Sequence, residues 1–244
     1  MLSARPWRGE AVLQFCGMVL FCYCLGQMIS LLLQKAGFAA FQPPEMFGVV
    51  LLGTLGFQGA TWVLIPIFLR QHRTGWREAF GFRGPQLPCA LLTTVKLVVL
   101  ILPAIWLLQY LSRLVLTRLG WPPEEQTAVA LIAGAKTWWM RIYLGLFAIV
   151  LAPVAEEFIF RGVLYPLVKQ LGYPRLAWIG VNAVFAIIHL DAGTLVPLFA
   201  LALALTWLYE QTDNLLAPIA AHSLFNTANL VLLSFAQNFS APAK

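Results

Sequence analysis

The feature that most constrains this chain is a series of long apolar runs, each separated from the next by a short stretch rich in Pro, Gly and charged residues. The first run, residues 11–33, exceeds the roughly 20 residues that a helix needs to cross the hydrocarbon core of a bilayer. Backbone N–H and C=O groups must be paired inside lipid, which favours helices for such runs. Composition agrees, since 60% of the 244 residues are hydrophobic and 11% are charged, against about 25% charged in soluble domains. We therefore expect an all-α, polytopic transmembrane helical bundle.

The apolar runs predict about seven membrane helices around a buried polar cavity. The expected ranges are 11–33, 46–69, 89–111, 138–164, 175–190, 195–209 and 215–235. The fifth and sixth ranges are short for a full span, which indicates tilt or re-entry. The segment from Ser112 to Lys136 is too polar to span and is expected to be an outside loop or an interfacial helix. Since no second domain is visible, we expect residues 1–244 to form a single membrane domain.

The net charge of +6 does not indicate nucleic-acid binding, because the basic residues lie in short loops between apolar runs. An excess of Lys and Arg in short loops is typical of the cytoplasmic side of a membrane protein. The cluster from Arg70 to Arg83 favours an orientation with the N-terminus in the cytoplasm. We expect an integral, multi-pass protein of the plasma (inner) membrane of a prokaryote. Its expected partners are the lipid bilayer and a membrane-anchored peptide or protein.

Ionisable and amide side chains interrupt the later apolar runs in three short strings. They are Glu156-Glu157-Phe158-Ile159-Phe160-Arg161, Phe185-Ala186-Ile187-Ile188-His189 and His222-Ser223-Leu224-Phe225-Asn226. A charge at bilayer depth costs at least about 2.5–3.5 kcal/mol, so such groups usually face a cavity and serve a function. Helix residues four apart share a face. This spacing allows Glu157 to pair with Arg161, and it lets His222 and Asn226 point into one cavity.

Each of these groups also has a purely structural interpretation. An ion pair that carries a polar helix end into the membrane explains Glu157 and Arg161 as well as a supporting catalytic role does. Glu156 is harder to explain structurally, because one arginine neutralises only one carboxylate, whereas a general base or a metal ligand needs this neighbour.

The histidines leave a similar choice. Taken alone, His189 fits a hydrogen-bonded core histidine as well as a catalytic one. The pair His222 and Asn226 predicts either donors for an oxyanion or a hydrogen bond that holds two helices together. Function is favoured because acid, imidazole and amide groups occur on three nearby helices in one third of the chain.

The ordered motifs EExxxR, FxxxH and HxxxN resemble those of the CPBP family of intramembrane proteases. This family includes the type II CAAX prenyl endopeptidases and the bacteriocin-processing or self-immunity (Abi) proteins. All three motifs match without a substitution, and residues 207–222 resemble the family's usual approach to the last motif. The likeness covers about residues 138–229, which we expect to form the catalytic core.

The resemblance implies an endopeptidase that hydrolyses a peptide bond of a membrane-anchored peptide or protein, prenylated in some members. Glu156 would activate the attacking water with help from His189. His222 and Asn226 would stabilise the tetrahedral oxyanion.

Under the same resemblance, Glu157 and Arg161 would orient the site. The sequence leaves a metal open, because two histidines and a glutamate are a recognised zinc set. Glu156, His189 and His222 would then bind Zn²⁺ or another divalent metal, with Glu157 as the base of a metalloprotease. Against this, the chain has no HExxH motif and the three candidates lie on three predicted helices.

Two other function classes remain open. A proton-coupled transporter would also use buried Glu, His and Arg, although transporters often show repeated halves and none is visible here. A non-proteolytic membrane scaffold or immunity protein is the other alternative, although a scaffold has no need of all four groups Glu156, His189, His222 and Asn226.

Overall fold

The computed structural model of the chain describes residues 2–43, 46–82, 87–122, 131–132, 134–135 and 137–240. Within these ranges every regular element is a helix, and six helices are long and apolar enough to cross a membrane. They are Gly9–Lys35, Phe47–Gln71, Cys89–Arg118, Trp138–Gln170, Leu195–Thr212 and Leu216–Leu233, and a shorter apolar helix spans Pro174–Ile187. The prediction of an all-α bundle of about seven membrane helices is confirmed, and the protein is an integral, multi-pass membrane protein.

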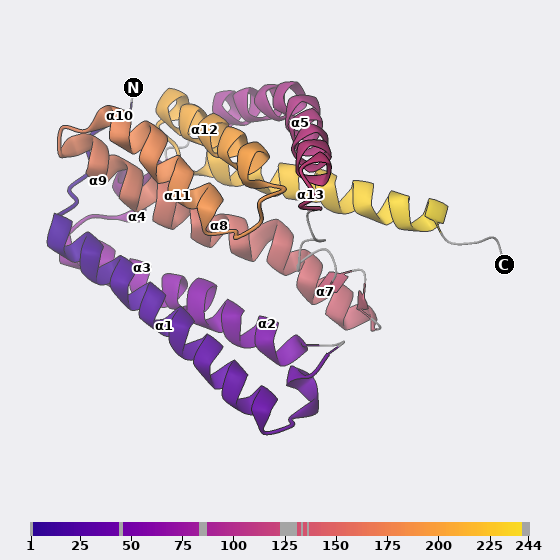
Figure 1. Ribbon diagram of the computed structural model, residues 1–244. Helices are drawn as coiled ribbons and strands as arrows, with labels where there is room; N and C mark the ends of the chain where they lie inside the picture. The colour runs from indigo at the N-terminus through magenta and orange to yellow at the C-terminus, as the bar shows by residue number, and fades with distance from the viewer. Residues whose placement is uncertain are drawn as a thin grey trace.

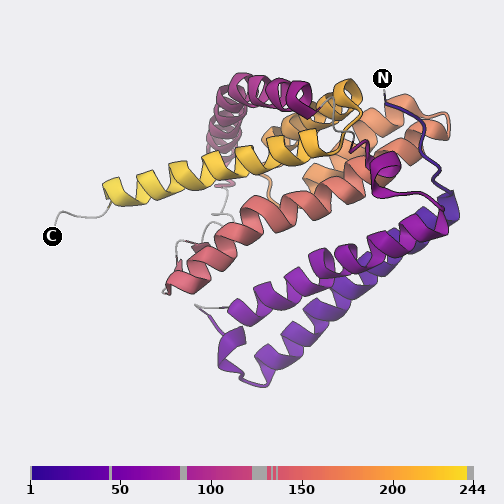
Figure 2. The same cartoon turned by 180° about the vertical axis from the view of Figure 1, so that it is seen from behind.

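The first two spans form an antiparallel pair on one side of the bundle (Figures 1 and 2). The pair consists of α1 (Gly9–Lys35) against α2 (Phe47–Thr54), a π-helical turn (Leu55–Gly59) and α3 (Ala60–Gln71). The two backbones approach closely, since a Cβ atom on Gly26 would lie 2.8 Å from the Leu52 carbonyl oxygen. A Cβ atom on Gly56 would lie 2.8 Å from the Cys22 carbonyl oxygen. Small residues therefore set the spacing of this pair, as in many membrane helix pairs.

A second group of spans packs on the opposite side of the bundle (Figure 1). It contains α5 (Leu87–Arg118), α12 (Leu195–Thr212) and α13 (Leu216–Ser240), which share a core that includes Val98, Ile105, Leu205 and Phe225. Helix α5 is bent in both views and contains Pro103, which cannot donate the helical hydrogen bond to the residue four positions earlier.

The structure corrects the predicted end of the third span. Helix α5 continues to Arg118, so residues 112–118 are helical and do not belong to a loop. The apolar residues Leu114 and Val115 lie between the polar ones, and both are exposed on this turn of helix. Of the rest of the predicted loop or interfacial helix, residues 119–122, 131–132 and 134–135 are described, and residues 123–130, 133 and 136 lie outside the described residues.

The fourth span, Trp138–Gln170, runs between these two groups as one continuous rod (Figure 1). It consists of α7 (Trp138–Leu146), α8 (Ala152–Glu157) and α9 (Tyr165–Gln170), joined by π-helical segments at Phe147–Leu151 and Phe158–Leu164. In the first π segment the Ala152 N–H donates to the Phe147 carbonyl, five residues back. The next residue in this register is Pro153, which has no N–H, so the carbonyl of Ala148 has no donor at that position.

The fifth helix is shorter than predicted. It consists of α10 (Pro174–Leu176), a π-helical segment (Ala177–Val181) and α11 (Asn182–Ile187). The predicted range 175–190 therefore ends at Ile187, and His189 lies in the turn that follows. Leu190 has a φ of +52°, a left-handed conformation that ends the helix.

One end of the bundle is closed by the chain's first residues and by α4 (Trp76–Phe80). The buried Arg5 guanidinium forms an ion pair with Asp213 and donates hydrogen bonds to the Glu78 carbonyl at 3.1 Å and to the Tyr209 hydroxyl at 3.2 Å. The Leu215 N–H donates to the Phe80 carbonyl at 2.9 Å. This end therefore joins the loop after α3 to the turn between α12 and α13.

Gly81 permits that junction. Its φ is +71°, and a Cβ atom there would lie 1.7 Å from the Asp213 carbonyl oxygen. The position thus excludes a side chain for two reasons, a left-handed backbone and a backbone contact.

We predict that Gly81→Ala destabilises the protein more than Gly172→Ala does. Gly172 has a φ of +91° with nothing within 4 Å of its Cβ position. Its substitution therefore incurs only the left-handed conformational cost, about 1–2 kcal/mol. Gly81→Ala incurs the same cost and also separates the backbones at Asp213. Thermal unfolding of the purified variants in one detergent checks this, and equal shifts in the midpoint would contradict it.

Candidate active site

The charged residues of the fourth span form a wholly buried ion pair. Glu157 ends α8 and Arg161 lies one turn later, in the second π-helical segment. Both side chains are 0% exposed, and Arg161 Nη1 donates to Glu157 Oε1 at 2.9 Å. The two residues therefore pair as their four-residue spacing predicts.

The Arg161 guanidinium is also held by two other helices. Its Nη2 group donates to the Ala202 carbonyl at 3.0 Å and to Asn182 Oδ1 at 3.3 Å, and Nε donates to Thr206 Oγ1 at 3.4 Å. The Thr206 hydroxyl in turn donates to Asn182 Oδ1 at 2.8 Å. The guanidinium carbon lies 4.5 Å from the centroid of the Phe185 ring, within the range of a cation–π contact.

Asn182 and Thr206 were not predicted from the sequence as part of the site. Both side chains are fully buried, and a polar residue inside an apolar helix was the available signal. Isolated Asn and Thr residues are common in membrane helices as interhelical hydrogen-bonding groups, so this signal alone does not predict a link to Arg161.

His222, on α13, lies between the two glutamates. Its Nδ1 atom is 3.0 Å from Glu157 Oε1, and its Nε2 atom is 3.9 Å from Glu156 Oε2. An ionised carboxylate only accepts hydrogen bonds, so Nδ1 is the donor to Glu157. The Nε2 atom then carries a proton only when the ring is an imidazolium.

His189 is positioned by the end of α11. Its Nδ1 group donates to the Phe185 carbonyl at 2.7 Å, and its ring centroid lies 5.0 Å from that of Phe185. With the proton on Nδ1, the Nε2 atom of the neutral ring is a hydrogen-bond acceptor. This tautomer suits a residue that holds a water molecule.

Glu156 and His189 line one cavity of about 660 Å³. The cavity lies between α1, α2 and its π-helical turn on one side and the fourth and fifth helices on the other. Its walls are mostly apolar and include Val19, Leu20, Val50, Phe57, Leu144, Phe147, Ile159, Phe160, Leu164 and Val184. The structure therefore brings the predicted base and the predicted water-holding histidine to the same surface, with His222 beside Glu156.

Asn226 shares a helix with His222 but makes a hydrogen bond of its own. Its Nδ2 group donates to the Ala148 carbonyl at 2.7 Å, the carbonyl that Pro153 cannot serve. An amide has two N–H groups, and this bond uses one of them. Asn226 therefore links α13 to the first π-helical segment of the fourth span.

The predicted metal ligands Glu156, His189 and His222 do not form a metal-binding group in this arrangement. In the part of the chain that the structure describes, no three His, Cys, Asp or Glu side chains are grouped as metal ligands. The Nδ1 atoms of His222 and His189 contact Glu157 and a backbone carbonyl, so only Nε2 of each ring would be available to a metal. The residues as placed do not fit a three-ligand zinc site, and we derive no step through a metal.

Comparison with known proteins supports the family prediction. Residues 136–228 match a family model described as "Type II CAAX prenyl endopeptidase Rce1-like". This match confirms the predicted resemblance to the CAAX-type intramembrane proteases over these residues. No curated protein matches the chain, and no solved structure matches it. The matched region contains all three motifs and indicates a protease.

We predict that Asn226→Ala lowers thermal stability, and that the loss is smaller in a Pro153→Ala background. Alanine at position 153 restores an N–H that can serve the Ala148 carbonyl, so the Asn226 bond becomes less important. We expect a loss of about 1 kcal/mol in the wild-type background, measured as the shift in the unfolding midpoint.

Asn229→Ala is the matched control, because the Asn229 side chain accepts a hydrogen bond from Trp106 Nε1 at 2.8 Å, which does not involve Pro153. Its effect should be the same in both backgrounds. A loss for Asn226→Ala that is also unchanged by Pro153→Ala would refute the link between the amide and this carbonyl.

Proposed function

We propose that this protein is an intramembrane endopeptidase, on the basis of the match of residues 136–228 to the Rce1-like family model. It hydrolyses a peptide bond of a membrane-anchored peptide or protein. The observation that supports this best is the shared cavity surface of Glu156 and His189, with His222 Nε2 3.9 Å from Glu156 Oε2.

In the proposed reaction, water is held by His189 Nε2 and gives a proton to the Glu156 carboxylate. The water oxygen attacks the carbonyl carbon of the scissile bond, and the carbonyl oxygen becomes an oxyanion. Cleavage of the C–N bond follows when Glu156 returns the proton to the departing amine. A positioned general base of this kind typically contributes about 10²–10⁴-fold to the rate.

The oxyanion is proposed to be stabilised by the His222 imidazolium through Nε2–H and by the second amide N–H of Asn226. Glu157 positions His222, because its Oε1 atom accepts the hydrogen bond from Nδ1 at 3.0 Å. Arg161 in turn fixes Glu157. These two residues act through His222 and are proposed to have no contact with the substrate.

The cavity walls favour a substrate with an apolar anchor. Its volume of about 660 Å³ lies within the range of small-molecule sites, and most lining side chains are apolar. An isoprenoid chain or the end of an apolar helix is therefore a suitable occupant, with the scissile bond near Glu156. Whether the substrate is prenylated is decided by the assay below.

We predict that Glu156→Gln abolishes peptide cleavage, with kcat/KM at least about 100-fold lower. The assay uses purified protein in nanodiscs and three peptides of one sequence, carrying a prenyl group, an acyl anchor or no lipid. The matched control is Glu78→Gln, which makes the same substitution at an exposed glutamate and should keep wild-type activity. Equal rates for the two variants would overturn the assignment of Glu156.

The same assay separates the rival functions. Proton uptake into liposomes without cleavage of any peptide would support a proton-coupled transporter instead. For a cleaving enzyme, loss of activity with a chelator and recovery with Zn²⁺ would favour metal participation, whereas activity that survives the chelator would favour direct action of Glu156.

We also propose that the N-terminus is cytoplasmic, on the basis of the Arg70–Arg83 cluster. Arg77 precedes α5 and Arg118 ends it, so the two lie on opposite sides of the membrane. In a cysteine-free background, we expect Arg118→Cys in intact cells to react with an impermeant maleimide. Arg77→Cys should react only after the cells are opened, and the reverse pattern would invert the orientation.

A further inference from the structure

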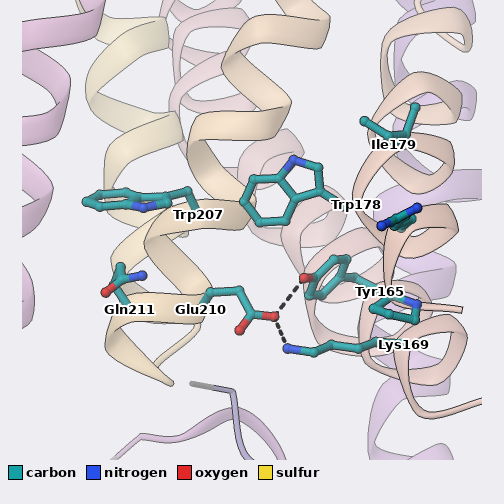
Figure 3. Close-up of a pocket in the computed structure, with 9 residues that line it drawn as sticks. Tyr165, Lys169, Trp178, Ile179, Trp207, Glu210 and Gln211 are labelled. Atoms are coloured by element: carbon teal, nitrogen blue, oxygen red, sulfur yellow. Dashed lines mark hydrogen bonds and ion pairs between the residues drawn. The ribbon is translucent and has the colours of Figure 1, made fainter. Parts of the chain in front are cut away.

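A second pocket, away from the cavity of Glu156, opens between α12 and the helices α9 and α10 with the adjoining π-helical segment (Figure 3). Its volume is also about 660 Å³. Trp178 and Trp207 both line the pocket with their indole rings close to each other, and Glu210 contacts Lys169 and Tyr165 (Figure 3). Tyr165 lies nine residues after Glu156, about 13 Å further along the helix.

The pocket lies at the level where the membrane meets water. The spans that contribute to it end at Gln170 and at Thr212, and Lys169 and Gln211 stand one residue before these ends. Tryptophan is enriched at this depth, because its ring is apolar and its N–H is polar. Trp207 is 41% exposed and Ile179 is 53% exposed, so this surface faces lipid and headgroups.

The charges in the pocket favour an anion. Glu210 accepts a hydrogen bond from the Tyr165 hydroxyl at 2.6 Å and one from the Leu2 N–H at 3.2 Å, and it is paired with Lys169. Its negative charge is therefore already neutralised within the protein. The Lys169 ammonium has three N–H donors and is still partly exposed, at 30%. Arg175, which also lines the pocket, is exposed, and its charge gives the group of Lys169, Glu210 and Arg175 a net charge of +1.

We propose that this pocket binds the phosphate headgroup of an anionic phospholipid. Arg175 and Lys169 contact the phosphate, and Trp178 and Trp207 lie against the glycerol and the first methylene groups. Basic pockets between membrane helices at this depth suit such headgroups. This site is separate from the proposed catalytic cavity and does not depend on the protease activity.

The test is native mass spectrometry of the purified full-length protein with phosphatidylglycerol or phosphatidylcholine of matched chains. We expect preferential retention of phosphatidylglycerol, weakened on the order of fivefold by Arg175→Gln. Arg77→Gln is the matched control, since Arg77 is another exposed arginine before α5 and lies outside the pocket. Trp207→Leu should also weaken retention, and unchanged unfolding midpoints establish that the variants are folded.

Several outcomes would overturn the proposal. Equal retention of the two lipids, or equal effects of Arg175→Gln and Arg77→Gln, would show that this pocket does not select an anionic headgroup. Displacement of the lipid by glycerol 1-phosphate at comparable concentration would assign the pocket to a soluble phosphate compound and reject the lipid.

Discussion

The rest of the site depends on one constraint, the hydrogen bonding of a guanidinium that lies wholly inside a membrane bundle. Removing a charge from water costs several kcal/mol, and only good pairing with further hydrogen bonds offsets it. The Arg161 guanidinium meets this requirement with groups from three helices. Glu157 lies in the same span as Arg161, Asn182 lies on α11, and Thr206 and the Ala202 carbonyl lie on α12. Its position is therefore determined by the bundle, and so is that of the carboxylate paired with it.

The Glu157 carboxylate in turn determines the position of His222 on α13. Glu157 Oε1 accepts hydrogen bonds from both Arg161 and His222. This fixes the orientation of the His222 ring and directs its other nitrogen toward Glu156. Phe185 contributes from the fifth helix, because its ring contacts Arg161, His189 and His222. The buried pair thus connects four helices, while Glu156 remains at the cavity surface.

Much of this arrangement follows from local sequence rules. The membrane-spanning helices can be predicted from the sequence, because the cost of burying polar groups in lipid restricts every residue of an apolar run. The Glu157–Arg161 ion pair can be predicted because the two residues are four apart and lie on one helix face. The contact of Asn226 with Ala148, 78 residues away in sequence, was not predictable. It depends on a π-helical register that leaves Pro153, which has no N–H, opposite the Ala148 carbonyl. The turn at His189 was missed because an FxxxH spacing suits a continuous helix as well as one that ends early.

The chain's first residues impose an order on biosynthesis. Leu2 bonds to Glu210 across 208 residues, and Arg5 finds its carboxylate partner only at Asp213. At about 5–20 residues per second, roughly 10–40 s of translation separate these groups. The first helix pair is therefore in the membrane well before this end of the bundle can be closed. Closure coincides with the synthesis of α13, so the N-terminal segment and the His222–Glu157 contact are completed at about the same stage.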